Sequence, residues 1–177
     1  FSISVNPEYL WDEKTGIYVD GSDFDGERSS RNCCQTDWER PINIEFFEKN
    51  GQLMFSEQAG VQVKGRMNCE FPKKPLGIYF RSKYGNNHVD YPFFKEKPIV
   101  QFSSFILRPG GADGMGDCYN GTMIRDGLLS TLLVDQMDID YEGYTPAVLF
   151  INGEYWGIHN IRERNKADYL ATNHGVD

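Results

Sequence analysis

The sequence predicts an α+β domain, in which a meander of short antiparallel strands carries one main helix. Three observations lead to this prediction. Short stretches of alternating apolar and polar residues recur between turn residues such as Lys49-Asn50-Gly51. The segment 122–137 has the apolar spacing of an amphipathic helix. Aromatic residues make up 14% of the chain and are mostly Phe and Tyr, which favour strands over an all-helical bundle.

Length and charge narrow the function classes. The 177 residues suit a single domain, or a complete portion of a larger protein. A net charge of −8 and a pI near 4.9 argue against a nucleic-acid partner. The chain has no apolar run long enough to predict a membrane span. Because it begins with Phe1 rather than Met, we expect a processed or trimmed product.

The first 40 residues contain a strand-like start, a polar turn and an apolar patch at 16–19. Residues 20–40 are rich in Gly, Ser, Asp and Arg and are predicted to form a flexible, solvated loop. A calcium loop is the alternative for this segment. The EF-hand spacing would place Gly21 and Asn32 at the first and twelfth ligand positions, where carboxylates are needed, so that pattern fails.

The middle of the chain supplies most of the predicted strands, and the helix follows. Strands are expected at 42–46, 53–55, 61–65, 76–81 and 104–108, with spacings that suit hairpins. In the helix at 122–137, Thr122 is the predicted N-cap. The apolar stripe consists of Ile124, Leu128 and Leu132, with Leu129, Leu133 and Met137 beside it. A last short helix is expected over about 166–173.

A β-hairpin is predicted around the turn Asn152-Gly153. This two-residue turn pairs Ile151 with Glu154, Phe150 with Tyr155 and Leu149 with Trp156. One face then carries Leu149, Ile151, Trp156 and Ile158, and the other carries Val148, Phe150 and Tyr155. Because both faces are apolar, we expect interior strands, covered by the helix on one side and by loops on the other.

The four cysteines are Cys33, Cys34, Cys69 and Cys118. Adjacent Cys33 and Cys34 cannot chelate a metal as a CxxC pair does, and no His stands at zinc-finger spacing, so structural zinc is disfavoured. Two disulfides, from Cys33 and Cys34 to Cys69 and Cys118, are one interpretation. Free buried thiols are the other.

Few residues indicate chemistry by their pattern alone. Lys74, in a Lys-Lys pair between two prolines, stands just before a strand and could offer a point charge to a phosphate. A solvated surface pair is the alternative. Arg125 and Asp126 fall in the first turn of the helix, where a surface ion pair is the default interpretation. The glycine-rich loop at 108–118 could cradle an anion with its backbone amides, but it lacks both GxGxxG and the Walker pattern.

The order of several motifs resembles the spore-coat protein H (CotH) kinase family. The resemblance runs over nearly the whole chain and is clearest at 1–21, 61–85, 103–114, 122–135 and 144–177. The last segment, YTPAVLFINGEYWGIHNIRERNKADYLATNHGVD, is the most specific, with its proline, apolar strand, NGEYWG and following acidic residue.

This resemblance implies a fold like the small lobe and hinge of an atypical protein kinase, spanning 1–177. It further implies a secreted or spore-associated bacterial protein that binds ATP with Mg or Mn and phosphorylates serine on extracellular or coat proteins. On that plan Lys74 reaches the nucleotide phosphates, Arg125 and Asp126 lie on the matching helix motif, and Glu163 lies near the base or ribose.

Two departures from the family pattern bear on activity. Cys69 stands where the family commonly has an arginine, and Arg66 is the nearby residue that could substitute for it. The family's catalytic loop and metal-binding aspartates would lie beyond Asp177, so no catalytic residue and no metal ligand is predicted within this chain. We therefore expect the chain to be inactive in phosphoryl transfer by itself.

Two other functions fit the sequence. The first is a non-catalytic structural or interaction module of an extracellular assembly, either a spore coat or a polysaccharide-degrading complex. Cys69 at the arginine position favours it. The second is a carbohydrate-binding module, which depends on Tyr and Trp residues being exposed.

Overall fold

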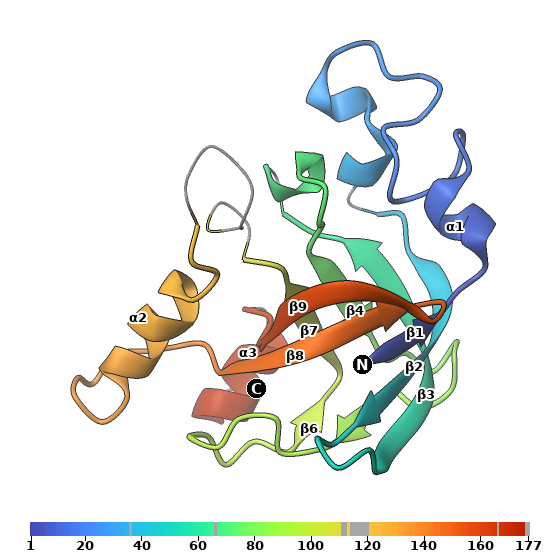
Figure 1. The fold of residues 1–177 in the computed structure, drawn as a ribbon. Coiled ribbons are helices and arrows are strands. Elements are labelled where there is room, and N and C mark those ends of the chain that lie inside the picture. The colour runs from blue at the N-terminus through green and yellow to red at the C-terminus, as the bar shows by residue number, and fades with distance from the viewer. Residues whose placement is uncertain (36, 66, 111–112, 114–120, 166, 176–177) are drawn as a thin grey trace.

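A computed structural model describes residues 1–35, 37–65, 67–110, 113, 121–165 and 167–175 (Figure 1). Within these residues, seven strands form a closed barrel in the order β1-β2-β3-β4-β7-β9-β8. They are β1 (Ser2–Ser4), β2 (Arg40–Phe47), β3 (Leu53–Val63), β4 (Leu76–Tyr79), β7 (Ser104–Arg108), β8 (Tyr144–Ile151) and β9 (Glu154–Arg162). The short strands β5 (Val89–Asp90) and β6 (Gln101–Phe102) form a separate ladder.

The barrel corrects the predicted fold class. The described chain is mainly sheet, a closed mixed barrel with few helices, and not an α+β kinase small-lobe meander with one main helix. The difference lies in β1, which pairs antiparallel with β2 and parallel with β8. Backbone bonds seal this seam, since the N–H of Asn152 donates to the carbonyl of Ile3 over 2.8 Å. Hairpin signals in the sequence reveal neighbouring strands only, so they could not show this closure.

Alternating side chains of the barrel strands fill a single apolar core. Ile44 of β2, Ile78 of β4, Phe105 and Leu107 of β7 and Ile161 of β9 are all fully buried. The intervening residues of β3, β4, β7 and β9 therefore point to the outer face of the barrel.

Three α-helices are present among the described residues: α1 (Pro7–Trp11), α2 (Arg125–Leu133) and α3 (Ala167–His174). Short 3-10 turns occupy Arg28–Ser30, Asn32–Cys34 and Asn68–Glu70. The terminal helix expected near 166–173 is confirmed by α3. Within the part of the chain that the structure describes, no helix has the length and apolarity needed to cross a membrane.

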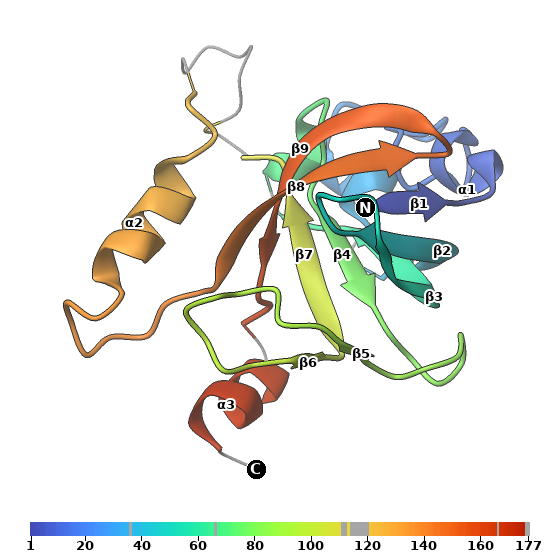
Figure 2. The ribbon, with the colours of Figure 1, turned by 60° about the horizontal axis from the view of Figure 1, so that its bottom comes forward.

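Helix α2 is shorter than predicted, and its apolar stripe is not covered by the barrel. It lies beside the sheet rather than over the hairpin (Figures 1 and 2). Ile124, Leu128, Leu129, Leu132 and Met137 are each at least half exposed. Gly127 is the contact point, because a Cβ there would lie 2.2 Å from the Tyr144 ring of β8. The helix therefore meets the hairpin at Gly127, and the prediction that its apolar stripe covers one face of the hairpin is wrong.

The hairpin of β8 and β9 follows the predicted register only near its turn. Ile151 pairs with Glu154 and Phe150 with Tyr155, but a bulge then pairs Leu149 with Gly157 instead of Trp156. The left-handed backbone of Gly157, with φ of 99°, accommodates the extra residue. Beyond the bulge, Ile158 faces outward and is 45% exposed, so the hairpin is not covered on both sides as predicted.

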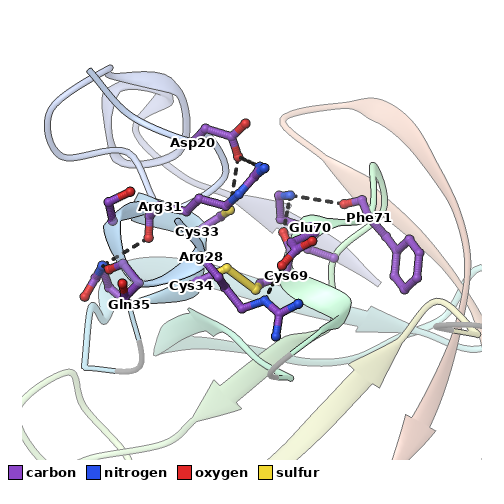
Figure 3. The surroundings of a disulfide bond; sticks show 12 residues. Asp20, Arg28, Arg31, Cys33, Cys34, Gln35, Cys69, Glu70 and Phe71 are labelled. Carbon is purple, nitrogen blue, oxygen red and sulfur yellow. Dashed lines mark hydrogen bonds and ion pairs between the residues drawn. A yellow bond between two sulfur atoms is a disulfide. The ribbon is translucent and has the colours of Figure 1, made fainter. Parts of the chain in front are cut away.

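One disulfide ties the 20–40 segment to the β3–β4 connection. Cys34 is bonded to Cys69 with their Cα atoms 5.4 Å apart, whereas Cys33 is a buried free thiol (Figure 3). Arg31 forms an ion pair with Asp20 beside it. Both sequence interpretations were thus partly correct, and Cys118 lies outside the described residues. The flexibility expected of residues 20–40 stays a prediction.

Candidate functional site

A strand and a helix are joined by an ion pair at the outer face of the barrel. Arg108, the last residue of β7, places Nη1 3.0 Å from Oδ2 of Asp126 in the first turn of α2. Strand alternation points Arg108 outward, because Leu107 faces the core. About a third of each side chain is exposed, so the pair can meet a ligand.

Arg162, at the end of β9, ties the same helix to a second strand. Its side chain is 4% exposed, and its Nε lies 3.7 Å from Asp126 Oδ2. Nη2 donates to Ser130 Oγ and to Glu142 Oε2, each over 3.1 Å. Nη1 is buried and has no hydrogen-bond partner among the described residues. Asp126 therefore lies between two arginines that come from different strands.

The start of α2 is fixed by a residue that the sequence did not single out. Asp113 accepts hydrogen bonds from the backbone N–H groups of Thr122, over 2.8 Å, and Arg125, over 2.9 Å. Burial by itself would raise the pKa of Asp113, but these hydrogen bonds outweigh it and hold the pKa below its ordinary value. The predicted N-cap, Thr122, does not cap the helix. The N-cap position is Ile124, and Asp113 supplies the acceptor from the preceding loop.

Basic side chains gather on the outer face beside this ion pair. Lys64 directly follows β3, and its backbone N–H bonds to Pro75 just before β4. Arg164 follows β9, and its guanidinium lies over the ring of Tyr79 in β4. With Arg108 they make a cationic surface across neighbouring strands (Figure 2 shows β4, β7 and β9). Arg162 is buried and adds no exposed charge to this surface. Alternation of apolar and basic residues in VQVK, FILR and NIRER is the signal that could have predicted it.

A cleft of about 720 Å³ opens between α2 and α3, next to this surface. Its polar lining includes Asp126, Glu142 and Arg162, and its apolar lining includes Leu129 and Tyr169. Asp126 is thus at once a partner of Arg108 and part of a cleft wall. A charged ligand with an apolar portion would match this lining.

Lys74 is not part of this surface. It is 6% exposed, and its ammonium donates to the backbone carbonyls of Cys69 and Phe71, over 2.5 and 3.1 Å. Burial lowers the pKa of Lys74 below its ordinary value. Its side chain stabilises the turn that carries the disulfide, so the structure does not bring it together with Asp126.

Glu163 is also internally occupied. Its carboxylate pairs with the buried Lys97 and accepts from the backbone N–H of Gly143 over 2.6 Å and from Asn173 over 2.9 Å. This network joins β9 to the segment before β8 and to α3. Lys97 was not singled out in the sequence, because its partner lies 66 residues away.

Of the other two predicted binding residues, the structure describes Arg125 but not Arg66. Arg125 pairs with Asp113 through Nε over 3.2 Å, and its side chain is 57% exposed. Arg66 lies outside the described residues. Within the described ranges, no three His, Cys, Asp or Glu side chains are placed to hold a metal ion together.

Comparison with known protein families identifies a family for this chain. The model of the family described as CotH kinase protein matches residues 61–177. This range covers the end of β3 and every later element, and so includes Lys64, Arg108, Asp126 and Arg162. No curated protein matches the chain.

Proposed function

Because the chain belongs to the CotH kinase protein family, we propose that it supplies the nucleotide-binding face of a kinase that phosphorylates serine on extracellular or coat proteins. The observation that carries this proposal is the ion pair between Arg108 and Asp126 inside the matched range. A bacterial, secreted or spore-associated location belongs to the same proposal.

Phosphoryl transfer depends mainly on positioning and on neutralising the charge of the phosphates. Protein kinases pair a strand lysine with an acidic residue of the following helix, and this pair must be in place for activity. Arg108 ends a strand, and Asp126 lies in the next described helix. We assign phosphate contact to Arg108 and Lys64, with Asp126 orienting Arg108.

The remaining predicted residues take different places in this proposal. Lys74 is held by carbonyls of its own turn, so we assign it to shaping the loop rather than to the phosphates. Arg66, Arg125 and Glu163 stay predicted neighbours of the nucleotide. ATP with Mg or Mn is the proposed cofactor pair. The cationic face suits the phosphates, whereas no described residue is assigned to the metal or to catalysis.

Calorimetry with ATP and either Mg or Mn tests the proposal. Asp126→Asn should weaken ATP binding about tenfold, because Arg108 loses the charged partner that orients it. Asp138→Asn is the matched control, since Asp138 is exposed just beyond the same helix and should leave binding unchanged. Thermal melting of each variant checks that the fold is intact. If ATP gives no heat with either metal, the kinase proposal is wrong.

A non-catalytic assembly module is the second candidate. Cys69, which stands where the family commonly has an arginine, forms a disulfide bond with Cys34. A disulfide-bonded side chain carries no positive charge, so it does not replace the arginine at a phosphate. Absence of nucleotide binding, together with an unchanged fold, would favour this second function.

A further inference from the structure

Tyr79 of β4 lies on the outer face of the barrel beneath three cations. The guanidinium carbons of Arg81 and Arg164 are each 4.9 Å from the centre of its ring, and Nζ of Lys64 is 5.2 Å away. The Tyr79 side chain is only 3% exposed. Its hydroxyl is buried and has no hydrogen-bond partner among the described residues. A buried hydroxyl without a partner is costly, so a bound ligand that supplies a partner which the described residues do not would stabilise this arrangement.

The positive charge around Tyr79 is only partly neutralised within the protein. Glu39 pairs with Arg81 over 3.0 Å and also with Lys83 over 2.9 Å. In the described part of the chain, no carboxylate lies within ion-pair distance of Lys64 or Arg164. The positive charges of Lys64 and Arg164, both held near the Tyr79 ring, repel each other, and an anion bound between them would offset that repulsion. This local positive charge contrasts with the net charge of −8 of the whole chain.

Gly77 brings the donors together. A Cβ at this position would lie 2.9 Å from the Tyr79 hydroxyl oxygen and 3.0 Å from Cε of Lys64. Both side chains therefore converge on the space that a side chain at 77 would take. The hydroxyl of Tyr79 and the stem of Lys64 meet there, two residues along the strand from the Tyr79 backbone.

We propose that Lys64, Tyr79 and Arg164 form an oxyanion site on the outer face of β3 and β4, which takes a phosphate group. The Tyr79 hydroxyl donates one hydrogen bond, and the two cations supply the charge. The site deepens the proposed function insofar as the phosphate belongs to a nucleotide.

Calorimetry with sodium tripolyphosphate, ATP and adenosine tests the site. Tyr79→Phe keeps the ring under the cations and removes only the hydroxyl, so tripolyphosphate should bind about tenfold more weakly. Its ligand-free melting temperature should stay equal or rise, because an unpartnered hydroxyl is removed. A purely structural hydroxyl would not produce this opposite pair of effects. Lys64→Gln and Arg164→Gln should each weaken binding and reduce its dependence on salt concentration.

Tyr155→Phe and Lys49→Gln are the matched controls, since both residues are exposed elsewhere and should leave binding unchanged. Absence of tripolyphosphate binding overturns the site. So does ATP binding that none of the three site variants alters. In that case the nucleotide function stands on Arg108 and Asp126, and the phosphate contact assigned to Lys64 is wrong. Conversely, tripolyphosphate binding that Tyr79→Phe weakens, with ATP binding no more tightly, supports the site and contradicts the nucleotide function.

Discussion

His159 shows at the residue scale how burial of one ionisable side chain affects the fold. It faces the barrel interior from β9, is 0% exposed, and has no hydrogen-bond partner for either ring nitrogen among the described residues. Burial, with the positive charges of Lys73 and the N-terminal amine, lowers its pKa to about 4. The neutral ring therefore serves as a core side chain.

The depressed pKa of His159 predicts a loss of stability in mild acid. Between pH 6.5 and pH 4 the imidazole of His159 is protonated in the unfolded state but neutral in the folded state. The free energy of unfolding therefore falls as the pH drops. The loss should approach about 3 kcal/mol at pH 4. Urea unfolding across this range should show a shallower fall for His159→Leu than for the natural chain. Equal slopes would contradict the assigned burial.

The predicted binding residues illustrate what single positions in the sequence can reveal. Arg125 and Asp126 were correctly located in the first turn of a helix, because capping and dipole rules act locally. Lys74 was placed by its proline neighbours, but its burial depends on a turn closed by a distant cysteine. Local pattern thus indicated the helix pair, whereas tertiary contacts determine which lysine faces outward.

At the scale of elements, α2 shows a helix held at its start rather than along its length. Most of its apolar stripe is exposed, while Asp113 binds the backbone of its first turn. The sequence periodicity correctly gave a helix in this segment, but periodicity does not show whether a partner covers the apolar side. The bulge at Gly157 was not predicted, because the rule for two-residue turns gives the strand register only next to the turn.

Loss of the Asp113 carboxylate should destabilise the start of α2. Asp113→Ala removes the acceptors of the Thr122 and Arg125 backbone N–H groups and the ion-pair partner of Arg125, so we expect a loss of about 1–2 kcal/mol in unfolding free energy. Urea unfolding measures it, and amide exchange at 125–128 should quicken. Asp138→Ala provides the comparison, with no expected change. Identical exchange in both variants would contradict the capping role.

At the scale of the whole molecule, closure of the barrel depends on the first few residues. Asn152, in the turn of the β8–β9 hairpin, accepts from the N–H of Val5 and donates to its carbonyl, over 2.8 and 3.0 Å. These contacts span 147 residues of sequence. No hairpin or helix rule reaches across such a separation, so the sequence predicted the hairpin itself but not its parallel neighbour.

A chain cut to residues 61–177, the range of the family match, should not fold cooperatively. It would lack β1, β2 and most of β3, which leaves the core open and two ladder edges unpaired. We expect it to aggregate or to unfold without a cooperative transition in circular dichroism, whereas residues 1–177 melt cooperatively. A sharp thermal transition of the shorter chain would show that the closing strands are dispensable.

Because β1 closes the barrel by pairing with β8, the closed fold begins at a different residue from the family match. Family membership is recognisable from residue 61 onward, yet the residues that enclose the interior begin at Ser2. The range that the family model matches is shorter than the range that the closed barrel requires. Experiments that exchange residues 61–177 between proteins of this family should therefore also include strands β1 and β2.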